Sequence, residues 1–149
     1  MAVDRLSLEG VRGRLSAASM AQVNKAPFVL QGDWLLDIPR LTLADLRKVT
    51  EASGRIAWQD AGGGLPSPLA LGNLGVDLAA ENGWLVMSLA DNGGPLGLVG
   101  TARWQPTKPL KLDTRLLARA DADRDLAAGL QLLGRADPDG WVRWRVQLQ

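Results

Sequence analysis

The sequence contains neither cysteine nor histidine. Without cysteine, disulfides, thiolate metal sites and cysteine nucleophiles are all excluded. Without histidine, the chain lacks the usual general base near neutral pH and the commonest metal ligand in proteins. The compartment stays open, because proteins without cysteine occur on either side of a membrane. The two absences argue against an enzyme and against a metal site.

An excess of charge of one sign is also missing. Seventeen basic side chains face sixteen acidic ones, which gives a formal net charge of +1 at pH 7. Such a chain has no bulk field to attract nucleic acid or an acidic membrane, so nucleic acid is not an expected partner. Tyrosine is absent as well, but there are six tryptophans, so almost all aromatic area comes from indole rings.

Long hydrophobic runs are lacking at the start of the chain. The segment from Met1 to Gly10 carries Asp4, Arg5 and Glu9, and it has no apolar stretch of the kind that a signal peptide or membrane span needs. We expect either a soluble parent protein or an N-terminal anchor that lies outside this sequence. The length and the hydrophobic fraction of 46% predict a single domain, residues 1–149, with its own core.

What the sequence does contain is alternation of apolar and polar residues with a period of two, which is typical of strands with one buried face. Alternation is clearest from Leu110 to Ala118 and from Val142 to Leu148. Asn82-Gly83 and Asn92-Gly93 favour tight hairpin turns between further strands. The predicted strands are 31–43, 54–59, 75–80, 84–90, 96–105, 110–118 and 142–148.

Two short helices are expected beside these strands. Asp121 or Asp123 can cap a helix over 124–133, and Gly134 suits the position after its end. Ser16 can cap a second helix from Ala17 to Val23. The predicted fold is mainly β: a curved antiparallel sheet or half-barrel meander with two short helices.

The sequence contains no complete motif for metal binding, phosphate binding or catalysis. Asp121, Asp123 and Asp125 resemble the start of a calcium loop, but Leu126 and Leu132 stand where that loop needs glycine and glutamate. The glycines at 94, 97 and 100 and the run 62–64 lack the lysine and hydroxyl residue of a phosphate loop. We interpret the first set as strand glycines and the second as a flexible loop. Without a histidine to activate any serine, and without an S-x-x-K spacing, the sequence predicts no catalytic residue, cofactor or metal.

Arginine and tryptophan residues near the C-terminus suggest a protein interface. On a strand, Arg143 and Arg145 point to one face and Trp144 to the other, so they form no stacking platform for nucleic acid. We expect Arg135, Arg143 and Arg145 to border a partner site, and we add two tryptophans as candidate interface residues. The complete predicted set is Arg135, Arg143, Arg145, Trp104 and Trp144.

A G-x-x-x-W pattern occurs three times, at 54–58, 100–104 and 140–144. A spacing of four places glycine and tryptophan on one face of a strand, where the glycine leaves room for an indole from a neighbouring strand. Core packing in a curved sheet is the simpler interpretation. The alternative is an apolar groove for a partner segment or a lipid.

Several segments, in their order and spacing, resemble type II secretion system protein N, also called general secretion pathway protein N. These are GRIAWQDA at 54–61, PLALGNL at 68–74, GGPLGLVG at 93–100, Asp121 with LAAGLQLLG at 126–134, and DPDG at 137–140. The resemblance is closest from Gly54 to the end of the chain.

The resemblance implies a role beyond what the residues themselves predict. Members of this family are anchored in the bacterial inner membrane by one N-terminal span and place the remainder in the periplasm. The chain would then be a periplasmic β domain that lacks its anchor. Its expected partners are the secretin and the inner-membrane platform subunits, which it would bind to support export of folded proteins. The family has no known active site, and the sequence leaves open whether the domain forms homodimers. The alternative function is a lipid- or peptide-binding groove module of the cell envelope.

Overall fold

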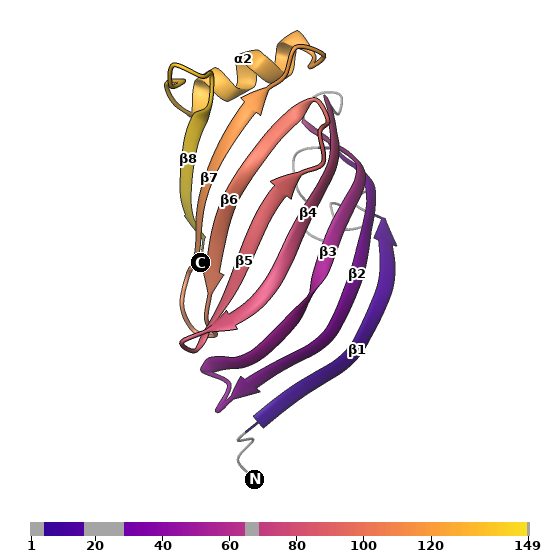
Figure 1. Cartoon of the computed structure of the whole chain (residues 1–149), viewed down its shortest axis with the longest axis vertical. Coiled ribbons are helices and arrows are strands. Elements are labelled where there is room, and N and C mark those ends of the chain that lie inside the picture. Colours follow the sequence, from indigo (N-terminus) through magenta and orange to yellow (C-terminus); the bar gives the residue numbers. More distant parts are fainter. Residues whose placement is uncertain (1–4, 17–28, 65–68, 149) are drawn as a thin grey trace.

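Eight strands form one open antiparallel sheet in the computed structural model, which describes residues 5–16, 29–64 and 69–148. Each strand pairs with the next along the chain, and the sheet bows into a trough that does not close (Figure 1). The predicted curved antiparallel meander is therefore confirmed. The elements are β1 (Arg5–Ser16), β2 (Val29–Ala44), β3 (Lys48–Gly64), β4 (Leu69–Glu81), β5 (Trp84–Asp91), β6 (Leu96–Trp104), β7 (Leu110–Ala118), α2 (Arg124–Leu133) and β8 (Val142–Leu148).

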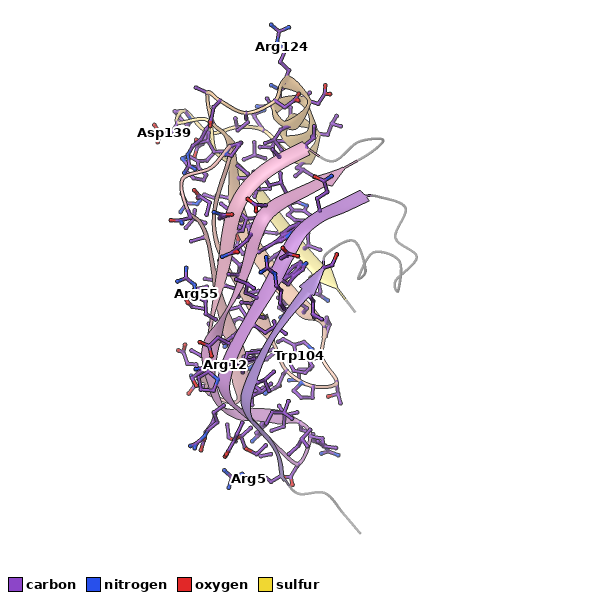
Figure 2. The ribbon with its side chains drawn as sticks, turned by 90° about the vertical axis from the view of Figure 1, so that its right-hand side faces the viewer. Arg5, Arg12, Arg55, Trp104, Arg124 and Asp139 are labelled. Atoms are coloured by element: carbon purple, nitrogen blue, oxygen red, sulfur yellow. The ribbon has the colours of Figure 1, made fainter. Side chains whose placement is uncertain are left out.

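Alternation along the strands gives the sheet two chemically different faces. On β4, Leu74, Val76 and Leu78 face the concave side, and Val76 stands between Ile56 of β3 and Leu89 of β5. Charged side chains occupy the opposite, convex side. Figure 2 shows Arg12 and Arg55 extending from the convex side, whereas Trp104 lies within the trough.

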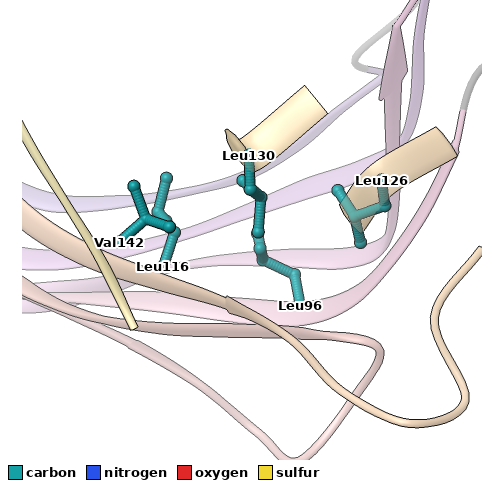
Figure 3. Close-up of a cluster of buried hydrophobic side chains, with 5 residues drawn as sticks. All are labelled: Leu96, Leu116, Leu126, Leu130 and Val142. Atoms are coloured by element: carbon teal, nitrogen blue, oxygen red, sulfur yellow. The ribbon is translucent and has the colours of Figure 1, made fainter. Parts of the chain in front are cut away.

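The core lies at one end of the trough, where α2 covers β6, β7 and β8. Leu126 and Leu130 of the helix pack with Leu96, Leu116 and Val142 of the three strands, and all five are buried (Figure 3). Asp123 caps the helix as predicted, because its Oδ1 accepts a hydrogen bond of 2.9 Å from the backbone N of Asp125. The second expected helix, 17–23, falls outside the described residues.

Gly134 ends α2 at the predicted place but for a different reason. Its φ of 168° is extended backbone, which any residue can adopt, and not the left-handed conformation expected after a helix. The segment from Asp137 to Gly140 forms a turn before β8, closed by a hydrogen bond of 2.9 Å from the backbone N of Gly140 to the carbonyl oxygen of Asp137. There the Asp137 carboxylate accepts hydrogen bonds from the backbone N–H groups of Asp139 and Trp141, both at 2.9 Å.

Two expectations about glycine are wrong. Residues 62–64 are not a flexible loop, because they continue β3 and pair with β2. The glycines of two G-x-x-x-W motifs make no room for an indole. The space beside Gly54 is filled by the backbone of Asp37 and Ile38, and that beside Gly100 by Asp113 and Thr114. An indole does lie over a glycine elsewhere, where Cη2 of Trp141 would be 3.1 Å from a Cβ at Gly97.

Asp91 stabilises the loop between β5 and β6. Its carboxylate accepts hydrogen bonds from Nη1 of Arg119 at 2.6 Å and from the backbone N of Gly93 and of Leu98, both at 2.8 Å. Burial of the side chain, which is 9% exposed, by itself raises the pKa of Asp91. The hydrogen bonds from Arg119, Leu98 and Gly93 outweigh that effect and lower the pKa from 3.8 to about 2.

Replacing Asp91 with asparagine is expected to lower the free energy of unfolding at pH 7 by about 2 kcal/mol, the amount that a shift from 3.8 to about 2 represents. Because the folded-state pKa is depressed, this contribution is present above about pH 4 and disappears as pH falls through about 2. Urea unfolding of both proteins across this range measures the difference, which should narrow below about pH 4. A difference that does not change with pH would contradict the role given to this carboxylate.

Candidate functional site

The five predicted interface residues lie on two opposite faces of the sheet. Arg143 and Arg145 project from the convex side of β8, and Arg135 lies in the loop between α2 and β8, beside the same hollow as Arg143. Trp104 and Trp144 are on the concave side, where Trp144 packs against the buried core. The structure thus brings the three arginines to one surface and separates them from both tryptophans.

Three rows of directly paired residues cross β6, β7 and β8 on the convex side. The first is Val99–Arg115–Arg143, the second Thr101–Asp113–Arg145, and the third Arg103–Lys111–Gln147. Arg115 therefore stands directly opposite Arg143, and Arg103 directly opposite Lys111. Like charges in direct cross-strand pairs destabilise a sheet.

A single carboxylate sits between these cations. Asp113 Oδ2 accepts a hydrogen bond from Nη2 of Arg143 at 2.9 Å and lies 3.6 Å from Nε of Arg145. Nε of Arg143 donates a second hydrogen bond, 3.2 Å long, to Asp113 Oδ1. The hydrogen bonds from Arg143 hold the pKa of Asp113 below its usual value, and the same contact raises the pKa of Arg143. Both residues stay charged at physiological pH, so the surface keeps its charge pattern.

Two adjoining hollows occupy this part of the sheet, on either side of Asp113. The larger, of about 750 Å³, is lined by Arg115, Arg135 and Arg143 together with Asp137 and Trp141. The smaller, of about 510 Å³, is lined by Arg103, Lys111 and Arg145. We call this region the C-terminal convex surface, defined by its six cationic and two acidic residues: Arg103, Lys111, Arg115, Arg135, Arg143, Arg145, Asp113 and Asp137.

In the other half of the convex side, which β1 to β4 form, the arginines are neutralised by ion pairs. The arginines of β1, β2 and β3 all pair with carboxylates; examples are Arg14 with Asp33 at 2.7 Å and Arg40 with Glu51 at 3.2 Å. Within the C-terminal convex surface, only Arg143 and Arg145 form an ion pair with any described residue. The near-zero net charge of the chain thus conceals a local excess of positive charge.

The concave side presents apolar area that α2 covers only in part. Leu116 is buried beneath the helix, whereas Leu110 and Leu112, further along the same strand, are only partly buried. At the far edge, Leu6, Leu8 and Leu15 of β1 are 42–47% exposed. On the neighbouring strands β2 and β3, the rings of Trp34 and Trp58 stack with centroids 4.9 Å apart. The concave side therefore has an apolar lining that is closed at one end and open at the other.

Sequence reasoning missed Arg103, Lys111 and Arg115. Alternation places Lys111 and Arg115 on the polar face of one strand, but it cannot tell which residues stand opposite them.

No group of three or more His, Cys, Asp or Glu side chains that could hold a metal occurs in the described ranges. Nor does the described part of the chain contain a helix with the length and hydropathy of a membrane span. The features of the described chain that could serve a function are thus the charged C-terminal convex surface and the apolar lining of the concave side.

Comparison with known proteins gives one match. A family model described as type II secretion system (T2SS), protein N matches residues 1–145, nearly the whole chain. No curated protein and no solved structure matches the chain. The resemblance inferred from the sequence segments is therefore confirmed.

Proposed function

The chain belongs to the type II secretion system protein N family, and from this premise we propose that it is an interaction subunit of the secretion machinery that works without catalysis. It binds the secretin, the inner-membrane platform subunits, or both, in the periplasm, as a single domain whose parent protein is anchored in the inner membrane. The observation that carries the proposal is the C-terminal convex surface, where four cations form no ion pair with a described residue.

Surfaces of this kind suit binding. Complementary charges steer partners into register and raise the rate of association, while a hollow admits side chains from the other protein. A neutral convex half next to a cationic one restricts the contact to one end of the sheet. These properties support a binding subunit whose partner carries negative charge at the contact.

The test is calorimetric titration of the chain with purified periplasmic domains of the secretin and of the platform proteins. We expect saturable binding to at least one of them, weakened by added salt because exposed charges are screened. A periplasmic domain from outside the secretion system serves as control. Absence of binding to every domain of the apparatus, in conditions where the chain is folded, would refute the proposal.

A second candidate function is a lipid- or peptide-binding groove, favoured by the exposed Leu6, Leu8 and Leu15 on the concave side. Mass spectrometry of the purified chain tests it on the same sample. A lipid carried through purification, together with no binding to the secretion domains, would favour the groove and make the role in secretion indirect.

A further inference from the structure

We propose that the free edge of β8 binds an extended segment of a partner protein in which acidic and apolar side chains alternate. The inference rests on the proposed function, because it specifies the chemistry of the segment that a secretion-system partner presents. It follows from three features of the C-terminal end of the sheet: the sign of its charges, the unpaired edge of β8, and the alternation of side chains along that strand.

The sign of the charges distinguishes this end of the sheet from the other. Across β1 to β4, directly paired charges are of opposite sign, as in Arg12–Asp37 and Arg55–Asp77. Across β6 to β8, two of the three directly paired charges are of like sign, Arg115–Arg143 and Arg103–Lys111. An anionic side chain on a strand added beside β8 lies next to Arg143 and offsets its repulsion from Arg115, so an acidic partner gains affinity here that it cannot gain at the balanced end.

The edge of β8 supplies the backbone for such a partner. One side of the strand pairs with β7. On the other side, Ala136 forms an isolated bridge to Val142, and a Cβ at Gly134 would lie 3.4 Å from the carbonyl oxygen of Arg143. From Trp144 to Leu148 the strand has no further neighbour among the residues that the structure describes. Unpaired N–H and C=O groups of an edge strand accept an added strand.

The alternation of β8 fixes the pattern of the added segment. Side chains that the segment places on the convex side lie next to Arg143 and Arg145, so acidic residues fit there. Side chains on the concave side lie next to Trp144 and Val146, where apolar residues fit. Neighbouring side chains on adjacent strands are about 5 Å apart, close enough for both kinds of contact.

A second copy of the chain is a poor occupant of this edge. Pairing β8 with β8 of another copy brings Arg143 and Arg145 against the same arginines. Pairing it with β1, the other edge strand, brings them against a strand whose convex side carries Arg12 and Arg14. Both arrangements place like charges together, which favours a different protein as the partner.

The probe is a short synthetic peptide that alternates glutamate and valine, titrated into the whole chain by calorimetry. We expect saturable binding that weakens with salt, and slower hydrogen exchange of the β8 backbone amides when the peptide is bound. A peptide of the same sequence with methylated backbone nitrogens cannot donate to the edge and is expected not to bind. Equal binding of the methylated peptide would overturn strand addition.

Matched variants locate the contact. The double variant Arg143→Glu, Arg145→Glu reverses both charges. It is expected to weaken peptide binding at least about tenfold. Arg12→Glu with Arg14→Glu makes the same change on the same face of the opposite edge strand, where each arginine also has an aspartate partner. This control is expected to leave affinity unchanged. Equal losses in both variants would refute the assignment to β8.

Other outcomes separate this inference from the proposed function. Vesicles of phosphatidylglycerol that bind through Arg143 and Arg145, with no binding of the peptide, would overturn the protein segment in favour of a membrane surface. Binding of a secretin or platform domain that survives charge reversal at both arginines would refute the β8 contact and leave the proposed function intact. Peptide binding at β8 without binding of any secretion domain would support the contact and refute the proposed function.

Discussion

Replacing Gly54 with alanine is expected to lower the free energy of unfolding by about 3 kcal/mol or more. Gly54 has a φ of +132°, which side-chain-bearing residues rarely adopt, and strain of this kind costs roughly 1–3 kcal/mol. A Cβ at this position would also lie 2.4 Å from the carbonyl oxygen of Asp37 and 2.7 Å from Cα of Ile38. Because both atoms belong to the backbone of β2, the paired strands must shift to admit the methyl group.

The position of Gly54 explains the crowding. The register of β2 against β3 shifts between Asp37 and Arg40, so β2 carries an extra residue opposite Gly54 and bends toward it. Alanine therefore disturbs the bulge that helps to curve the sheet. Urea unfolding followed by tryptophan fluorescence measures the loss of stability.

Gly13→Ala is the matched control. Gly13 also lies in a strand, but a Cβ there would meet no atom within 4 Å, and its φ is not positive. Alanine at this site is expected to change stability by less than about 0.5 kcal/mol, or to raise it slightly by restricting the unfolded chain. Equal stability of the two variants would show that the bulge tolerates a side chain at Gly54.

The sequence predicted the second half of the sheet well because its signals are local. Val142–Leu148 alternates without interruption, Leu110–Ala118 departs from the polar side of the pattern only at Leu117, and both strands have the predicted bounds. Asn82 and Gly83 adopt φ values of 52° and 86°, as a two-residue hairpin turn requires. Asn92-Gly93 is a looser case, because four residues separate β5 from β6 and the carboxylate of Asp91 organises them.

The first half was predicted less completely, and bulges are the physical reason. The strand predicted at 54–59 extends over Lys48–Gly64, and its pairing with the neighbouring strands shifts register at several points. Each shift moves the following residues to the other face, so the alternation in the sequence is broken while the strand continues. Residues 62–64 have no side chains to alternate, which is why they were mistaken for a loop.

The candidate site was predicted in part for a similar reason. Alternation within β8 correctly separated Arg143 and Arg145 from Trp144. It could not reveal that Arg115 stands opposite Arg143, because the residues that face each other depend on the register between strands. Pairs of like charge across strands become visible only in three dimensions. The excess of positive charge at one end of the sheet is therefore a property of the fold.

Leu130→Ala in α2 is expected to lower the free energy of unfolding by about 3 kcal/mol, within the range of roughly 2–5 kcal/mol found for buried leucines. Leu130 is 8% exposed and packs with Leu96, Leu116 and Val142 beneath the helix. Its truncation leaves a cavity between the helix and the sheet. Since only Leu126 and Leu130 of α2 belong to this buried cluster, the cover over the trough is expected to loosen as well.

Leu132→Ala provides the control within the same helix. Leu132 is 88% exposed, so the same change in side chain removes almost no buried area. Alanine also favours a helix slightly more than leucine, so stability should stay within about 0.5 kcal/mol of the parent chain. Chemical unfolding compares the two variants, and hydrogen exchange of the α2 amides reports whether the helix detaches before the sheet unfolds. Similar stabilities for both variants would mean that the packing of Leu130 against the sheet contributes little to the stability of the core.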